Sequence, residues 1–148
     1  MGLIAIDTNV LVYAVHTASP RHRTAKRILE RLAGGRESWA LPWPCVYEFL
    51  RVVTNAAAFK TPWPPEQALA EAGKILAAPR LQLLAETSAH PRIMASVVQQ
   101  AQCRGNLMHD AHIWALCLEH GVAELWSGDH DFHRFQGLRL RNPFESEA

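Results

Sequence analysis

Short apolar runs alternate with longer amphipathic stretches along this chain, and that alternation constrains the fold more than any other feature of the sequence. The first run, at residues 3–6, reads Leu-Ile-Ala-Ile, and others lie at residues 38–41, 81–84, 124–126 and 138–140. The stretches between them have the length of helices, with apolar residues three and four positions apart. Strands that alternate with helices build a parallel sheet covered by helices. We therefore expect an α/β fold whose central, mostly parallel sheet has four or five strands flanked by helices.

The helices are predicted from their periodicity and from the residues that begin and end them. Ser19 and Pro20 offer an N-cap and a first-position proline for a helix that Gly34 ends. Other helices are expected over about residues 8–15, 44–55, 65–77, 91–104 and 109–120.

Composition bounds the remaining possibilities. The chain has 148 residues, 49% of them hydrophobic and 20% charged, which predicts a single compact domain over residues 1–148. Neither a membrane span nor a signal peptide is indicated. The three cysteines include no CxxC pair, so we expect neither disulfides nor a thiolate zinc site, and a reducing cytoplasm is the expected compartment. A formal net charge of +1 does not by itself indicate a nucleic-acid partner.

Four acidic residues follow or face the predicted strand ends. Asp7 comes directly after the first strand, and Asp129 comes shortly after the fourth. Glu48 and Asp110 lie near the beginnings of two helices, from which they can reach the same edge of the sheet. Ligands of open α/β sheets bind at the carboxyl ends of the strands, which is where these four side chains are expected to meet.

A cluster of carboxylates needs a cation, because like charges brought together raise one another's pKa. Oxygen ligands alone suit Mg²⁺ or Mn²⁺, which also bind phosphates and activate water. Each acid also has a purely structural interpretation. Asp7 suits the N-cap of the next helix, and Asp110 complements a helix dipole. Asp129 and Asp131 are favoured turn residues. Glu48 stands among apolar neighbours, where burial without a partner would be costly.

Four segments that carry these acids resemble the motifs of PIN-domain nucleases. In chain order they are Ile6-Asp7-Thr8-Asn9-Val10, Val46-Tyr47-Glu48-Phe49-Leu50, His109-Asp110-Ala111-His112 and Trp126-Ser127-Gly128-Asp129. The resemblance extends over essentially the whole chain and is greatest to the VapC-type toxins of bacterial toxin–antitoxin pairs. One departure is mild: Ser127-Gly128 replaces the more usual threonine and larger residue.

This resemblance implies a PIN-like fold and Mg²⁺-dependent endonucleolytic cleavage of RNA, often tRNA or rRNA. It also implies a cognate antitoxin and a homodimer. Carried over to this chain, it makes Asp7, Glu48, Asp110 and Asp129 the catalytic, metal-binding acids, and Glu48 the residue that positions or deprotonates the attacking water. Supporting roles follow for three neighbours: Thr8 and Ser127 would orient these groups, and Asp131 would assist through water.

Two other functions remain open. His109 with His112, and His130 with His133, have a three-residue spacing beside aspartates, which a zinc hydrolase also uses. A protein-binding module with the same fold and no catalysis is the second alternative. A serine hydrolase and a nucleotide-binding enzyme are disfavoured, since the chain has no GxSxG, GxGxxG or Walker-type segment.

The substrate-binding residues are less well defined. Basic residues of the second helix suit either RNA phosphates or an ordinary solvated face; they are Arg21, Arg23, Lys26, Arg27 and Arg31. Aromatic residues available to stack on a base are Trp39, Trp43, Tyr47 and Trp63. Apolar surface on the helices between residues 19 and 77 would suit an antitoxin segment or a second subunit. No residue distinguishes RNA from DNA as the substrate.

Overall fold

A five-stranded, wholly parallel sheet forms the centre of the molecule in the computed structural model, which describes residues 2–145. The strands are β1 (Ile4–Ile6), β2 (Trp39–Pro42), β3 (Leu81–Leu84), β4 (Glu124–Trp126) and β5 (Arg139–Arg141). Their spatial order is β3-β2-β1-β4-β5. The expected α/β fold and the approximate strand positions are confirmed, and of the predicted four or five strands the sheet has five.

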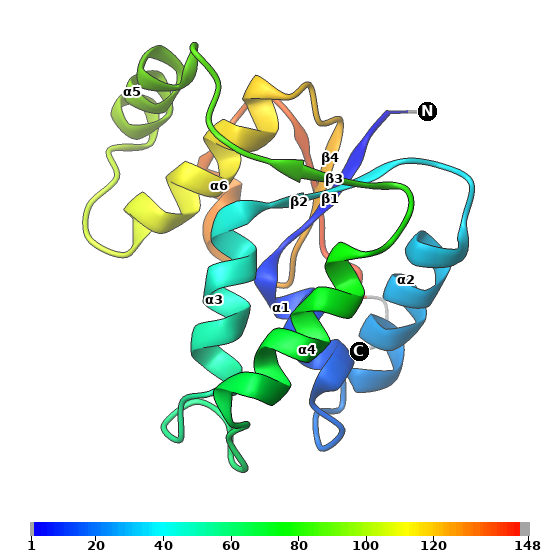
Figure 1. Ribbon diagram of the computed structural model, residues 1–148. Coiled ribbons are helices and arrows are strands. Elements are labelled where there is room, and N and C mark those ends of the chain that lie inside the picture. Colours follow the sequence, from blue (N-terminus) through cyan, green and yellow to red (C-terminus); the bar gives the residue numbers. More distant parts are fainter. Residues whose placement is uncertain (1, 146–148) are drawn as a thin grey trace.

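Six α-helices connect the strands. They are α1 (Thr8–Val15), α2 (His22–Gly34), α3 (Trp43–Val53), α4 (Pro65–Leu76), α5 (His90–Ala101) and α6 (Leu107–Glu119), and a short 3₁₀ helix covers His130–Arg134. In Figure 1 the pair α5 and α6 lies to the left of the sheet, whereas α1, α2 and α4 lie below it and to the right. No helix in residues 2–145 is both long and apolar enough to cross a membrane.

Helix boundaries follow the expected proline and glycine signals at most positions. Proline occupies the first turn of α3, α4 and α5, where no intrahelical hydrogen bond is lost. Gly121 follows the end of α6 with φ +67°, a left-handed conformation that glycine adopts without a steric penalty. The predicted end of α5, at about residue 104, was too late. The helix ends at Ala101, because Gln102 has a left-handed backbone conformation with φ 52°.

The predicted start of α2 was wrong. Ser19 and Pro20 lie in a turn, and the hydroxyl of Ser19 accepts a hydrogen bond from the Arg21 backbone N–H at 3.1 Å instead of capping a helix. The helix begins at His22, whose Nδ1 lies 2.9 Å from the Tyr13 carbonyl oxygen at the end of α1. The first residue of α2 is thus in contact with the end of α1.

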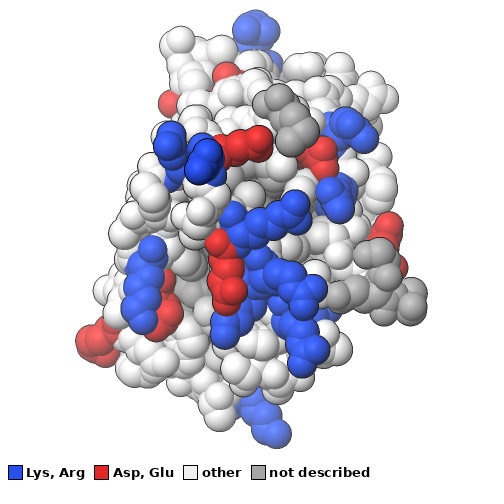
Figure 2. All heavy atoms as spheres, turned by 90° about the vertical axis from the view of Figure 1, so that its right-hand side faces the viewer, with Lys and Arg blue, Asp and Glu red and all other residues white. Residues whose placement is uncertain are grey.

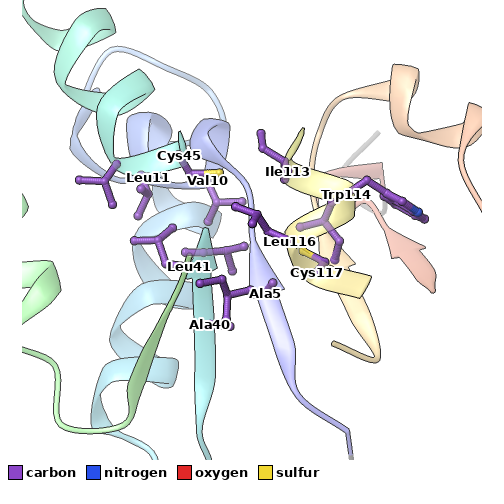
Figure 3. Close-up of a cluster of buried hydrophobic side chains, with 14 of the residues drawn as sticks. Ala5, Val10, Leu11, Ala40, Leu41, Cys45, Ile113, Trp114, Leu116 and Cys117 are labelled. Atoms are coloured by element: carbon purple, nitrogen blue, oxygen red, sulfur yellow. The ribbon is translucent and has the colours of Figure 1, made fainter. Parts of the chain in front are cut away.

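The core lies between the strands and the helices on either side of them (Figure 3). Ala5 and Ala40, on adjacent strands, are fully buried, and their small side chains let the helices approach the sheet. Trp114 of α6 is also buried and stacks on Phe132 with ring centroids 6.0 Å apart. This aromatic contact packs the segment that follows β4, and with it Asp129, against α6.

The topological switch lies between β1 and β4. From β1 the chain proceeds outward through β2 to β3, and then crosses to the other side of β1 to form β4. Asp7 follows β1, and its backbone N–H donates to the Trp126 carbonyl at the end of β4, at 3.0 Å. Asp7 therefore lies at the switch point of the sheet, where ligands of such folds bind.

Candidate active site

Asp7 is the most constrained of the four predicted acids. It is 5% exposed, and its carboxylate oxygens have separate donors. Oδ1 accepts from the Thr8 backbone N–H at 2.7 Å, and Oδ2 accepts from the Ser127 hydroxyl at 2.7 Å. The capping interpretation of Asp7 is thus correct, and the residue still faces the open edge of the sheet. Burial raises the pKa of Asp7 above its ordinary value, although these hydrogen bonds oppose the rise.

Ser127 links the first acid to the fourth. Its buried hydroxyl donates to Asp7 and accepts from the Asp129 backbone N–H at 2.9 Å. Asn9 donates from Nδ2 to the same hydroxyl at 3.4 Å, and its Oδ1 accepts from the Gly128 N–H at 3.2 Å. The sequence interpretation missed this role of Asn9. The signal was present, because Asn9 and Thr8 are uncharged polar residues at the start of a largely apolar helix.

Three carboxylates converge beside Asp7. Asp110, in the first turn of α6, Asp129 and Asp131 each place one oxygen within 4.8 Å of the others. Asp129 also caps the 3₁₀ helix, accepting from the Asp131 N–H at 2.9 Å, so its turn role is confirmed as well. Burial, and after it the charges of Asp129 and Asp7, raise the pKa of Asp110 to about 7. Without a cation, this side chain is therefore protonated in a substantial fraction of molecules at neutral pH.

Glu48 lies on the outer wall of the same site. The cost of burial without a partner does not arise, because the side chain is partly exposed and forms an ion pair with Arg51, whose Nε donates to Oε2 at 3.1 Å. The hydrogen bond from Arg51 lowers the pKa of Glu48, which keeps this carboxylate ionised. The pair has i,i+3 spacing on one helix face, a pattern that the sequence displays.

Two adjoining hollows contain these groups. A hollow of about 270 Å³ is lined by all four predicted acids and by Thr8 and His109. A second, of about 570 Å³, is lined by Glu48, Arg51 and His109 together with Trp43, Tyr47 and His112. We call the smaller hollow with its four acids the acidic centre. Since Glu48 and His109 line both hollows, the acidic centre continues into a larger, partly aromatic groove.

The acidic centre suits a hard divalent cation. The Thr8 hydroxyl oxygen is buried and has no hydrogen-bond partner among the described residues, and Thr8 is one of the residues that line the smaller hollow. Unsatisfied buried hydroxyls are costly, so a water or an ion beside it is favoured. The remaining donors are carboxylate oxygens, which Mg²⁺ and Mn²⁺ prefer. Burial is the main cause of the raised pKa of Asp110, and the charges of the neighbouring carboxylates add a repulsion that such a cation would relieve.

The sequence matches the family model of the PIN domain over residues 4–138. The chain belongs to the PIN-domain family. Its curated PIN-domain relatives include ribonuclease VapC48 of Mycobacterium tuberculosis, 38% identical over 138 residues that cover 93% of this chain and 95% of the relative. Ribonuclease VapC37 of the same species is 36% identical over the same coverage.

Solved PIN-domain structures have the same fold. A chain in the crystal structure of VapBC2 from Rickettsia felis, bound to a DNA fragment from its promoter, superposes with a TM-score of 0.68. It is 19% identical, and the match covers 95% of this chain and 98% of that one. Mycobacterium tuberculosis VapC20, described as a toxin that cleaves the sarcin–ricin loop, gives a TM-score of 0.62 at 19% identity, covering 92% and 98% of the two chains.

The aromatic residues proposed to stack on a base in this PIN domain differ in their exposure. Trp39 is buried in β2, so its proposed stacking on a base was wrong. Trp63 packs on Phe49 and Phe59. In contrast, Tyr47 is 66% exposed beside Trp43, at the edge of the larger hollow. All three cysteines are free and buried.

Proposed function

We propose that this chain is a metal-dependent endoribonuclease that acts in the cytoplasm as the toxin of a toxin–antitoxin pair, hydrolysing phosphodiester bonds in tRNA or rRNA. Four carboxylates, Asp7, Glu48, Asp110 and Asp129, are its catalytic and metal-binding residues, with Mg²⁺ or Mn²⁺ as the cofactor. The observation that carries this proposal is their convergence, from four separate elements, on one hollow at the switch point of the sheet. The similarity to curated VapC ribonucleases supports it.

The bound cation would stabilise charge on the phosphoryl oxygens and lower the pKa of the attacking water. Asp7, Asp110 and Asp129 are the anchoring groups, and Asp7 is held in place by Thr8 and Ser127. Glu48 is ionised and faces both hollows, which suits it to position that water or to accept its proton. Asp131 is exposed at the rim, and its proposed role is to assist through water.

The groove beyond Glu48 is the proposed path of the RNA. Tyr47 and Trp43 offer ring faces for stacking on an unpaired base, and Arg51 offers a guanidinium for a phosphate. The basic residues of α2 are a weaker candidate. That face carries acidic side chains among its Lys and Arg residues (Figure 2), and Arg21 packs against the rings of Tyr13 and Phe144.

Cleavage of RNA tests the proposal directly. Purified wild type, Asp7→Asn and the matched surface variant Glu66→Gln would be incubated with a mixture of tRNA and rRNA, with Mg²⁺, with Mn²⁺ or with a chelator. We expect discrete fragments from the wild type and from Glu66→Gln in Mg²⁺ or Mn²⁺, and none from Asp7→Asn or after chelation. Mapping the fragment ends identifies the RNA and the cleavage sequence.

The controls distinguish the competing functions. Cleavage that survives both chelation and Asp7→Asn would contradict a carboxylate nuclease. Cleavage restored by Zn²⁺ but not by Mg²⁺ would favour the zinc hydrolase. If Mg²⁺ stabilises neither the wild type nor Asp7→Asn against heat, the chain lacks the cation site and the binding-module alternative is favoured.

An antitoxin protein and a second copy of the chain are the proposed protein partners. Leu69 of α4 is 61% exposed, and Tyr47 of α3 is also exposed, so the helical side of the molecule presents apolar surface to a partner. Light scattering of the purified chain, alone and after co-expression with the protein encoded beside it, measures both assemblies. A monomer that remains unbound by that protein would contradict this part of the proposal.

A further inference from the structure

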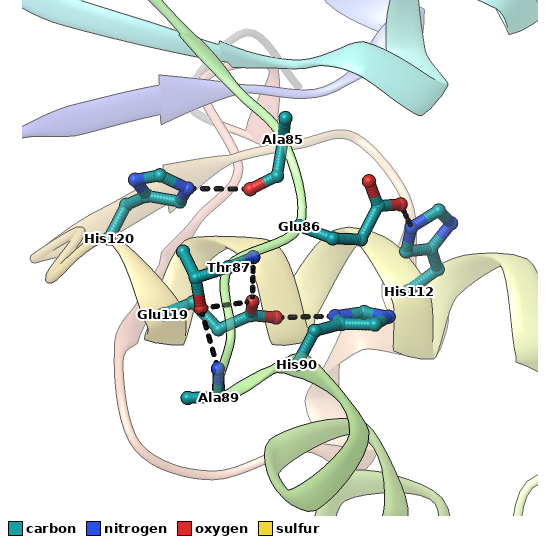
Figure 4. Close-up of polar contacts among 8 residues, drawn as sticks. All are labelled: Ala85, Glu86, Thr87, Ala89, His90, His112, Glu119 and His120. Atoms are coloured by element: carbon teal, nitrogen blue, oxygen red, sulfur yellow. Dashed lines mark hydrogen bonds and ion pairs between the residues drawn. The ribbon is translucent and has the colours of Figure 1, made fainter.

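Two histidines and two glutamates meet outside the acidic centre, at the junction of three segments (Figure 4). Glu86 follows β3, His90 is the first residue of α5, and His112 and Glu119 lie on α6. One nitrogen of each histidine and one oxygen of Glu86 lie within 4.8 Å of one another. The sequence spacing of His109 and His112 had indicated a histidine pair, but the fold brings His112 beside His90 instead, with ring centroids 5.4 Å apart.

Glu119 orients one of these rings. Its side chain is fully buried, and Oε1 accepts from the backbone N–H and the hydroxyl of Thr87, at 2.9 and 2.8 Å. Oε2 lies 2.6 Å from His90 Nδ1. Because a carboxylate accepts hydrogen bonds, Nδ1 carries the proton, and in the neutral form of the ring the other nitrogen, Nε2, has a free lone pair. Protein sites for transition metals hold their imidazole ligands in this way.

Glu86 and His112 supply the remaining donors. Nε2 of His112 lies 2.6 Å from Oε1 of Glu86, and the two side chains are 31% and 50% exposed. Both line the larger hollow beside the acidic centre. Tetrahedral Zn²⁺ has ligands at about 2.0–2.1 Å, which places them closer together than the present 4.8 Å limit. The side chain of Glu86 is half-exposed and is hydrogen-bonded to His112, itself a proposed ligand, so it can shift toward a bound ion without disturbing the core.

We propose that Glu86, His90 and His112 form a second cation site, which binds Zn²⁺ or a similar transition-metal ion rather than Mg²⁺. Imidazole nitrogens suit such ions, whereas Mg²⁺ prefers oxygen. Three protein ligands would leave a fourth position for water or an anionic oxygen, and two of the three, Glu86 and His112, line the larger hollow. The ion would tie the segment after β3 and the start of α5 to α6, the helix that carries Asp110.

Calorimetric titration of the untagged, metal-free protein with Zn²⁺, in excess Mg²⁺ to occupy the acidic centre, tests this site. We expect one tight Zn²⁺ in the wild type and an affinity reduced at least tenfold in both Glu86→Gln and His90→Ala. Glu86→Gln changes a half-exposed side chain, so it remains informative if loss of His90 disturbs the fold. Two controls retain the proposed ligands: Asp7→Asn alters the acidic centre, and His133→Ala removes an exposed histidine stacked on His130.

The outcomes are distinct. Tight binding that is preserved in Asp7→Asn and His133→Ala, and lost in Glu86→Gln, supports the site. The proposal is overturned if the wild type does not bind Zn²⁺, if Glu86→Gln binds as tightly as the wild type, or if binding is lost in either control. The activity of the acidic centre does not enter this measurement, so failure of the proposed ribonuclease function leaves its result interpretable.

Discussion

Replacing Asp110 by asparagine should stabilise the metal-free protein at alkaline pH and weaken its response to Mg²⁺. Burial and the neighbouring carboxylates, Asp129 and Asp7 foremost, together raise the pKa of Asp110 to about 7. The folded protein therefore disfavours the ionised side chain, which the unfolded chain tolerates. An amide of nearly the same shape removes that charge and its repulsions, but it is a poorer ligand for a cation.

The magnitude follows from the pKa. A rise from 3.8 to about 7 corresponds to about 4 kcal/mol, at about 1.4 kcal/mol per unit. Because Asp110 is only half-buried, screening by solvent reduces the effect to about 1–2 kcal/mol. For a domain of this size that change raises the melting temperature by about 3–6 °C.

The sign fixes the pH window. A raised folded-state pKa means that the contribution of Asp110 to stability is fully present below 3.8 and is lost as pH rises through about 7. The asparagine variant does not titrate at this position. Its advantage over the wild type should therefore be largest above pH 7 and should shrink as pH falls toward 4.

Thermal unfolding in a chelator, followed from pH 4 to pH 8.5, measures this difference, and Asp131→Asn provides the matched control. Asp131 is exposed, so neutralising it should have a smaller effect. Addition of Mg²⁺ should raise the melting temperature of the wild type more than that of Asp110→Asn. A variant that is no more stable than the wild type at pH 8.5, or a difference that does not change with pH, would refute the electrostatic reasoning.

Three further changes test the packing and the support of the site. Ser127→Ala removes the donor to Asp7 Oδ2 and should reduce RNA cleavage about 10- to 100-fold in a single-turnover assay; cleavage at the wild-type rate would contradict this positioning role. Trp114→Ala should cost about 3–5 kcal/mol in urea denaturation, because the ring is buried, and a loss below 1 kcal/mol would contradict its place in the core. Gly137→Ala should destabilise by more than about 1 kcal/mol, since φ is +109° and the new Cβ would lie 2.8 Å from a leucine methyl carbon of α6. Gly73→Ala, in an open position on α4, is its control and should stabilise by about 0.5–1 kcal/mol.

Much of the fold was predictable because its signals are local. An apolar run such as residues 3–6, followed by Asp7, identifies both a buried strand and the side chain at its carboxyl end. Prolines in the first turns of α3, α4 and α5 mark helix starts for a steric reason that needs no tertiary contact. The same logic failed at Ser19, where a turn after α1 uses the hydroxyl that was expected to cap α2.

The acids that line the candidate site were predictable from the sequence, whereas their exposure and ion pairs were not. The sequence indicated all four acids, but it placed Glu48 among apolar neighbours without the Arg51 ion pair that holds it ionised. It also offered Trp39 for stacking, although that ring lies in the core. Exposure and pairing depend on what other segments cover, which periodicity within one segment does not contain.

The sequence by itself determined the strands, most of the helix boundaries and the position of each acid relative to its own element, because these depend on residues a few positions apart. The tertiary structure decided the strand order, the hydrogen bond between Asp7 and Ser127 across 120 residues, and the meeting of His90 with His112. It also decided the raised pKa of Asp110. A pKa depends on burial and on the distances between charges, and packing of the whole chain sets both.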